Sequence, residues 1–216
     1  RLWCNTACMI FSESKGFVFF AVPKTGTHSV REQLRPLLTT EDWEQQLLTG
    51  RMLSPIKALA EIGHGHISYA QLTAAMGRET IATMHRFAFV RHPIDRFMSA
   101  CAFLARTDPS YNRDPVSWAQ RAFSQPQFRR RVLIRPQTEM LTNEDGEIAM
   151  SFIGRFESLQ EDLNKVLRRL GEPEVILKKT NVTQNQKPHL LASLAFIDEL
   201  KDFYDEDFRL LGYGPD

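Results

Sequence analysis

The feature that most constrains the fold of this chain is an apolar run that leads directly into a short polar turn. The run covers residues 17–22 (FVFFAV) and lies between Gly16 and Pro23. Because it does not alternate with polar residues, it predicts a strand buried on both faces, as in a parallel sheet. The following residues read KTGTHSVREQL, which places a cation, hydroxyls and a glycine before a helix predicted to begin near Ser29. The expected order is strand, tight turn and helix.

This order predicts an anion-binding loop. In such a loop the backbone N–H groups and the positive end of the helix dipole point to one place. The common nucleoside triphosphate loop has four residues between two glycines and a Lys-Ser/Thr pair after the second. Here Lys24 precedes Gly26, so its ammonium would lie beside the outer end of a bound phosphate chain. The alternative is an ordinary strand–turn–helix with a solvated lysine, because short motifs have many chance matches.

A second predicted strand leads into a second chemical stretch. Residues 87–90 repeat the pattern of a buried strand, and Arg91 follows at its carboxyl end. Apolar residues then recur at helical spacing, so one helix face is expected to pack on a core while the other carries Asp95, Arg96 and Ser99. An arginine at a strand tip and a serine two turns along the helix could bind one phosphate through a guanidinium fork and a hydroxyl. The alternative is a surface arginine and an unrelated helix serine.

Two histidines flank a glycine in the segment GHGHISY, residues 63–69, just before a helix predicted over Tyr69–Met76. We expect the two histidines to face opposite ways, with at most one of His64 and His66 in a given site. Two alternatives stay open, namely a structural imidazole bonded to the backbone and half of a metal site.

The densest positive cluster is Arg129-Arg130-Arg131, with Arg135 close behind. Such a cluster is either a solvated face or a docking surface for an anionic acceptor such as an acidic glycan. The polar segment at residues 178–188 is likewise either an ordinary surface loop or a loop that contacts a ligand.

Outside these motifs, periodicity predicts further elements. A helix is expected over residues 39–53, with Trp43 on its apolar side. Another is expected over residues 158–170, with Ser158 as the first residue of a capping box. A short last strand is expected at residues 175–177.

Length and charge narrow the classes of protein. A chain of 216 residues with 43% hydrophobic residues can bury one substantial core, so we expect a single domain over residues 1–216. The formal net charge of +1 provides no global attraction to nucleic acid, and no nucleic-acid partner is expected. The cysteines, Cys4, Cys8 and Cys101, form no disulfide framework, although Cys4 and Cys8 could pair. The oligomeric state stays open.

No run approaches the roughly 20 apolar residues of a membrane-spanning helix, and no secretory signal is visible. The expected location is therefore the cytoplasm if the chain is complete. Since the chain begins at Arg1 rather than at Met, a removed N-terminal anchor is an alternative, and it would place the domain in the Golgi lumen.

Taken in order, the motifs resemble those of sulfotransferases that use 3'-phosphoadenosine 5'-phosphosulfate (PAPS). Residues 23–29 (PKTGTHS) are similar to their 5'-phosphosulfate loop, roughly Pro-Lys-x-Gly-Thr/Ser-Thr/Ser. Residues 91–100 (RHPIDRFMSA) match their 3'-phosphate pattern Arg-x-Pro-x-x-Arg-x-x-Ser-Ala at every fixed position. The histidine segment resembles His-Gly-His-Val-Ser-Phe of heparan sulfate and uronyl 2-O-sulfotransferases. The resemblance to this carbohydrate-type, family 2-like branch extends from about Phe17 to Tyr213, with His28 as a departure where a small hydroxyl residue is usual.

The resemblance implies an α/β fold, a single P-loop-like domain with a central parallel sheet flanked by helices on both faces. It implies PAPS as the donor, adenosine 3',5'-bisphosphate (PAP) as the product, no required metal, and a hydroxyl acceptor on a glycan or other small molecule. In-line transfer then needs a cation for the leaving phosphate, the role implied for Lys24, and a base for the acceptor proton, the role implied for His66.

Further binding roles follow from the same resemblance. The rival hypotheses are a P-loop nucleotide kinase, which would need Lys-Ser/Thr after the glycine and a metal-binding acid, and a non-catalytic binder of anionic glycans on the same fold. The candidate donor-binding residues are Lys24, Thr25, Gly26, Thr27, His28, Ser29, Arg91, Ser99, Thr183 and Lys187, and the candidate acceptor-binding residues are His64, Arg130 and Arg135.

Overall fold

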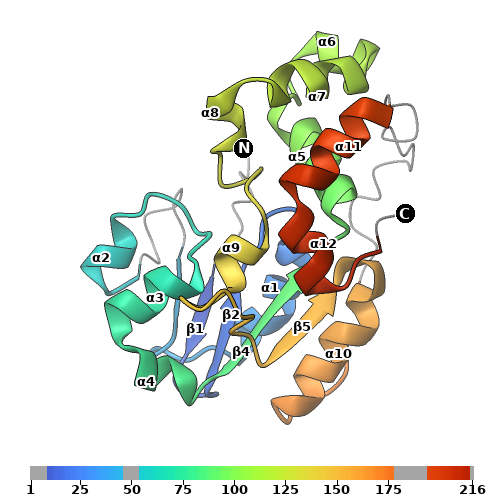
Figure 1. The fold of residues 1–216 in the computed structure, drawn as a ribbon. Helices are drawn as coiled ribbons and strands as arrows, with labels where there is room; N and C mark the ends of the chain where they lie inside the picture. Colours follow the sequence, from blue (N-terminus) through green and yellow to red (C-terminus); the bar gives the residue numbers. More distant parts are fainter. Residues whose placement is uncertain (1–8, 46–53, 178–193, 215–216) are drawn as a thin grey trace. The chain divides into compact units, whose positions relative to one another are not determined.

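A computed structural model describes residues 9–45, 54–177 and 194–214 (Figure 1). The chain divides into two compact units. The sheet unit comprises Arg1–Val90 and Glu139–Lys178, and the helical unit comprises Arg91–Thr138 and Lys179–Asp216. The single domain expected from the sequence stays a prediction.

The sheet unit contains a five-stranded mixed sheet in the order β3-β1-β2-β4-β5. Strands β2, β4 and β5 are parallel neighbours, whereas β1 pairs antiparallel with both β2 and β3. The predicted α/β class is confirmed, and the predicted parallel sheet is its core, with an antiparallel edge added by the tight turn between β1 and β2. The strands are β1 (Ile10–Ser12), β2 (Phe17–Phe20), β3 (Trp43–Glu44), β4 (His85–Val90) and β5 (Phe152–Arg155).

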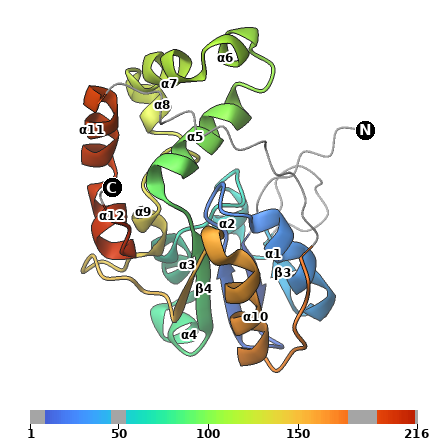
Figure 2. The ribbon, with the colours of Figure 1, turned by 90° about the vertical axis from the view of Figure 1, so that its right-hand side faces the viewer.

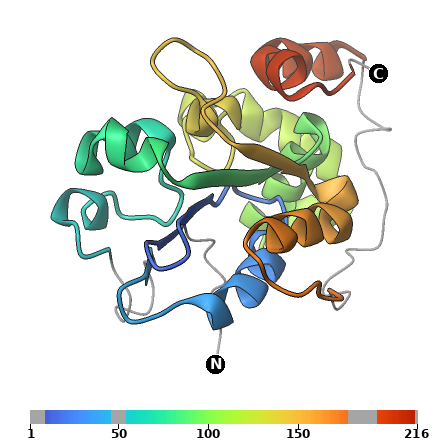
Figure 3. The same cartoon turned by 90° about the horizontal axis from the view of Figure 1, so that it is seen from below.

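Helices cover both faces of this sheet, as predicted. On one face, alternate phenylalanines of β2 and β4 pack with apolar residues of α1 (Thr27–Leu34) and α10 (Leu159–Arg169) in one buried cluster. On the other face, the ring centroid of Phe20 lies 6.2 Å from that of Tyr69 in α3 (Tyr69–Met76). Figure 3, viewed from below, shows α1 and α10 on one side of the strands and α3 on the other. Helix α3 has the predicted bounds.

The helix expected over residues 39–53 is wrong at Trp43, which lies in strand β3. The Trp43 ring stacks on Phe11 of β1 with centroids 5.4 Å apart, and the neighbouring Glu44 forms an ion pair with the buried Arg31 of α1. These partners are distant in sequence and override a local helical pattern. Residues 46–53 lie outside the described part of the chain.

The helix expected over residues 158–170 is α10. It begins one residue later than expected, after the 3₁₀ turn η2 (Phe156–Ser158). The capping box does not form, because the Ser158 hydroxyl donates to the Asp162 carboxylate at 2.8 Å instead of accepting a backbone N–H. The strand expected at residues 175–177 is also wrong. Its backbone bonds to side chains of α10, with the Leu177 N–H donating to Gln160 Oε1 at 2.7 Å.

The helical unit has an aromatic core. The ring of Phe97 contacts those of Phe123, Phe196 and Tyr204 at centroid distances of 5.5, 6.2 and 6.4 Å. Figure 2 shows α11 leading into α12 at the carboxyl end of the chain. The helices of this unit are α5 (Pro93–Leu104), α6 (Pro109–Arg113), α7 (Pro115–Phe123), α8 (Pro126–Arg129), α11 (Leu194–Phe203) and α12 (Asp205–Leu211).

The described residues also form several shorter elements. They are the 3₁₀ turn η1 (Arg35–Leu37) and the helices α2 (Lys57–Ala60), α4 (Arg78–Ala82) and α9 (Thr138–Leu141). Within the described ranges, no helix is both long enough and apolar enough to cross a membrane.

Candidate functional site

The loop between β2 and α1, residues 21–26, has the tight conformation that the sequence predicts. The Thr25 hydroxyl is fully buried and donates to the Val22 carbonyl at 2.9 Å, which closes the turn from within. Gly26 is left-handed, with φ +79°, and stands at the N-cap of α1. The first turn of α1 directs its N–H groups and its positive dipole end at the loop. Gly26 has no side chain that could cap these N–H groups. This geometry suits an anion.

Gly26 is needed for a second reason that the sequence does not reveal. A Cβ atom at this position would lie 2.7 Å from Leu159 Cδ2 and 3.2 Å from Phe156 Cδ2. A larger residue would therefore push the loop away from the start of α10, besides adopting an unfavourable left-handed conformation. The close contact between the loop and the start of α10 thus requires a residue without a Cβ atom at position 26.

Lys24 is also left-handed, with φ +68°, and it is the only non-glycine residue with positive φ in the described part of the chain. This conformation is uncommon for a residue with a Cβ, and a residue held in it costs about 1–3 kcal/mol. Residues in such strained conformations cluster at active sites and ligand-binding sites. Lys24 is half-buried.

The following residues continue into α1. Thr27 is buried, while His28 and Ser29 are half-buried. The His28 Nε2 atom lies 3.2 Å from Glu32 Oε1, so this imidazole lies along the helix surface. A role for His28 as a ligand would therefore fall to its backbone.

His66 is tied to the beginning of the same loop. Its side chain is buried, and its Nδ1 atom lies 2.7 Å from the carbonyl oxygen of Ala21. A carbonyl can only accept, so Nδ1 carries the proton and the neutral ring has its lone pair on Nε2. This is the tautomer that a base acting through Nε2 requires.

His64 lies close to His66. Gly63 is left-handed and residues 64–65 form a bend, so the two imidazole centroids are 6.2 Å apart. The Gly65 carbonyl accepts from the Met9 N–H at 2.9 Å, which anchors the bend beside β1. The expectation that the two histidines face opposite ways does not follow from their spacing, because side chains two residues apart lie on the same face of an extended segment.

In the helical unit, Arg91 follows the last residue of β4. Its backbone N–H donates to Gln137 Oε1 at 3.0 Å, and its carbonyl accepts from Gln137 Nε2 at 2.8 Å. Ser99 lies half-buried on α5. Gln137 has no local sequence signal, and only the folded structure reveals its contact with Arg91.

Arg96, expected on the polar face of α5, is instead fully buried. Its guanidinium donates to the carbonyls of Leu133, Ile134 and Arg135 at 3.1, 3.2 and 2.6 Å. It also lies 5.5 Å from the ring centroid of Tyr204. The middle arginine of the Arg-x-Pro-x-x-Arg-x-x-Ser-Ala pattern therefore holds a backbone segment, which a helical periodicity cannot predict.

The basic cluster divides into two kinds of arginine. The guanidinium groups of Arg129 and Arg131 lie over the rings of Phe123 and Phe128, 5.2 and 5.7 Å from their centroids. Arg130 and Arg135, the two candidate acceptor-binding residues, are exposed, as is Arg131.

Other candidate residues contribute less to the described site. Cys101 is buried in α5, and burial raises the pKa of its thiol far above the usual range, which disfavours a nucleophilic thiolate. Among residues 9–45, 54–177 and 194–214, no group of three or more His, Cys, Asp or Glu side chains could hold a metal ion. Cys4, Cys8, Thr183 and Lys187 lie outside the described ranges.

The structure thus groups the candidates in two sets. In the sheet unit, the bond between His66 and Ala21 brings the candidate base to the β2–α1 loop that contains Lys24 and Gly26. In the helical unit, Arg91 lies just before α5 and Ser99 lies on it.

Comparison with known proteins bears on nearly the whole chain. The family model described as "Sulfotransferase family" matches residues 8–214. A curated protein of Archaeoglobus fulgidus, described as "Uncharacterized protein", is 30% identical over 100 residues, which cover 44% of this chain and 74% of that protein. No solved structure matches the chain significantly.

Proposed function

This chain belongs to the sulfotransferase family, and on that premise we propose that it transfers a sulfuryl group from PAPS to a hydroxyl of a carbohydrate acceptor by in-line displacement with a histidine base. PAPS is the donor that the family generally uses. The observation that best supports the proposal is the β2–α1 loop, in which a left-handed lysine and a left-handed glycine precede the amino end of a helix. His66 adds a buried imidazole bonded to the first residue of that loop.

The proposed roles follow the charges that develop during transfer. The bond between sulfur and the bridging oxygen breaks as the acceptor oxygen forms its bond to sulfur. The leaving 5'-phosphate of PAP gains negative charge, which the Lys24 ammonium and the N–H groups of the loop and of α1 would stabilise. The acceptor hydroxyl loses its proton to His66 Nε2, the atom with the lone pair in the tautomer that the bond to the Ala21 carbonyl implies.

Donor binding is proposed for both sets of candidates. Thr25, Gly26, Thr27, His28 and Ser29 would bind the 5'-phosphosulfate group, in large part through the backbone. Arg91 and Ser99 would bind the 3'-phosphate through a guanidinium fork and a hydroxyl. Thr183 and Lys187 are proposed as further donor contacts on the resemblance alone.

Acceptor binding is proposed for His64 and for two exposed arginines. The imidazole of His64 lies 6.2 Å from that of His66, centroid to centroid, so it could contact the same acceptor. Arg130 and Arg135 are exposed in the helical unit and could contact acidic groups of a glycan. The two arginines favour an anionic carbohydrate among the possible hydroxyl acceptors.

The direct test is transfer of labelled sulfate from PAPS to a panel of glycans, lipids and small alcohols. Labelled glycan is the expected product. Phosphate transfer from ATP without sulfate transfer would support a kinase, and glycan binding without any transfer would support a non-catalytic binder. Transfer to a lipid or a simple alcohol alone would retain the sulfotransferase reaction and exclude the carbohydrate acceptor.

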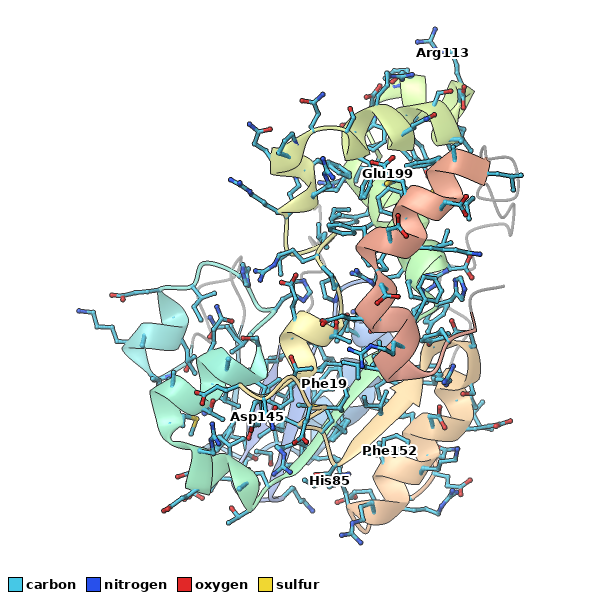
Figure 4. All side chains as sticks on the ribbon, in the orientation of Figure 1. Phe19, His85, Arg113, Asp145, Phe152 and Glu199 are labelled. Carbon is cyan, nitrogen blue, oxygen red and sulfur yellow. The ribbon has the colours of Figure 1, made fainter. Side chains whose placement is uncertain are left out.

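Arg91→Ala is expected to weaken the binding of PAP by about tenfold or more, because a charge-assisted hydrogen bond contributes roughly 1.5–3 kcal/mol. AMP lacks the 3'-phosphate, so its affinity should change little. Calorimetry with both nucleotides measures the difference. Arg113→Ala is a matched control, since Figure 4 shows Arg113 extending outward at the end of α6. Equal wild-type affinities for PAP and AMP would contradict the role of Arg91.

Sulfate transfer is expected to continue in excess EDTA. The reason is the proposed use of a lysine and backbone N–H groups, rather than a metal, to neutralise the leaving phosphate. Initial rates with EDTA, with EDTA followed by Mg²⁺, and without either would measure the effect. Loss of turnover in EDTA and its recovery with Mg²⁺ would favour the kinase-like mechanism instead.

A further inference from the structure

The backbone of Arg91 is held by one buried side chain. Gln137 is fully buried, and its amide group bonds to both the N–H and the carbonyl of Arg91, at 3.0 and 2.8 Å. In an antiparallel sheet, the two residues of a hydrogen-bonded pair likewise form two hydrogen bonds with each other, one through each N–H. Arg91 lies one residue beyond the end of β4, so this side chain continues the role of a strand partner past the described strand.

A buried carboxylate determines how the Gln137 amide is oriented. Asp207 of α12 is fully buried, and its Oδ2 accepts from the backbone N–H of Gln137 at 2.9 Å and from Gln137 Nε2 at 3.2 Å. Its Oδ1 accepts from the N–H and the hydroxyl of Thr138, both at 2.9 Å. Because a carboxylate only accepts, it draws the NH₂ end of the amide toward itself. The oxygen end is then left for the Arg91 N–H.

The backbone segment before Gln137 has anchors of its own. The guanidinium of Arg96 donates to three successive carbonyls, those of residues 133–135, and the hydroxyl of Tyr204 donates to the Ile134 carbonyl at 2.6 Å. The Gln137 amide adds nothing to those bonds. Its two bonds to the Arg91 backbone therefore serve the placement of Arg91.

We propose that Gln137 is a positioning residue for Arg91 in recognition of the donor 3'-phosphate, and that Asp207 acts through Gln137. This inference rests on the proposed function. A guanidinium fork recognises phosphate only in a narrow geometry, and a small displacement of the groups around a ligand weakens such contacts strongly. The Gln137 amide limits that displacement by holding the backbone from which the Arg91 side chain extends.

The test compares the affinities of PAP and AMP in the full chain by calorimetry. Gln137→Ala is expected to weaken PAP binding by about tenfold and to leave AMP binding within about twofold, so the ratio of the two affinities falls. Gln137→Met keeps most of the buried volume without the amide, and the same fall in the ratio is expected. Gln127→Ala, an exposed glutamine of α8, is the matched control and should keep the wild-type ratio.

A double-mutant cycle separates positioning from general stability. If Gln137 acts through Arg91, the variant Arg91→Ala/Gln137→Ala should bind PAP about as weakly as Arg91→Ala alone. Losses that add fully would overturn the inference. So would a Gln137→Met variant that binds AMP normally and keeps the wild-type ratio. A wild-type chain that does not distinguish PAP from AMP would contradict the proposed function itself, which is a different outcome.

Discussion

Replacement of His66 by asparagine is expected to lower kcat by roughly 10²–10⁴-fold and to leave the affinity for PAP nearly unchanged. Asparagine Nδ2 occupies about the place of histidine Nδ1, so it can still donate to the Ala21 carbonyl, which lies 2.7 Å from His66 Nδ1. It offers no lone pair at the place of Nε2. The variant therefore keeps the structural hydrogen bond and removes the proposed base.

The measurement is single-turnover transfer to a competent acceptor, alongside PAP binding. His85→Asn is the matched control, because His85 begins β4, at the opposite end of the parallel strands from the β2–α1 loop, and is labelled near the bottom of Figure 4. His64→Asn should lose less activity than His66→Asn. If His64→Asn is inactive while His66→Asn is near wild type, the two roles are reversed. If both are active, the base lies elsewhere.

The pH dependence of kcat tests the proposed role of His66 independently. Protonation of an imidazole removes the lone pair that takes the acceptor proton, so wild-type kcat should fall as the pH is lowered. His66→Asn should lack this acid limb in its low residual activity. An unchanged acid limb in the variant would assign the titration to another group.

Lys24→Ala is expected to lower kcat by about 10²–10³-fold, because the leaving phosphate loses a preorganised positive charge. A loss confined to KM, with kcat unchanged, would show that Lys24 contributes equally to ground-state and transition-state binding. Lys57→Ala is the matched control, since the Lys57 side chain is 90% exposed in α2. Full activity of Lys24→Ala would exclude the proposed role.

A glycine variant separates the charge of Lys24 from its backbone. Lys24 has φ +68°, a conformation that glycine adopts without steric cost. Lys24→Gly should therefore keep the loop folded and show a similar loss of kcat to Lys24→Ala. If Lys24→Gly retains activity while Lys24→Ala does not, the left-handed backbone rather than the ammonium is what the reaction requires.

The elements that the sequence predicts well are those with strong local signals. Unbroken apolar runs predict β2 and the end of β4, since strands buried on both faces need such runs. Ser68 and Gln71 form a capping box at the amino end of α3, a local hydrogen-bonding device, and the predicted bounds of α3 are confirmed. The two donor motifs follow these strands directly, so their order along the chain is also a sequence property.

The errors have a common cause in partners that are distant in sequence. Trp43 follows a helical pattern but pairs with Phe11 in the sheet. Arg96 shares the exposed-looking face of α5 but donates to carbonyls more than thirty residues away, at residues 133–135. In each case burial and hydrogen bonding outweigh a local preference, which is a weak term in the stability of an element.

The sequence by itself determined the family, the α/β class and the types of residue available for donor binding and proton transfer, because these depend on short segments read in order. Only the tertiary structure decided which imidazole nitrogen of His66 carries its proton, through the carbonyl of Ala21, 45 residues away. It also decided that Gln137 holds Arg91 and that Asp207, 70 residues beyond Gln137, orients the amide. Tautomers and amide orientations depend on buried hydrogen-bond partners, and folding alone brings those partners within 3 Å or so of each other.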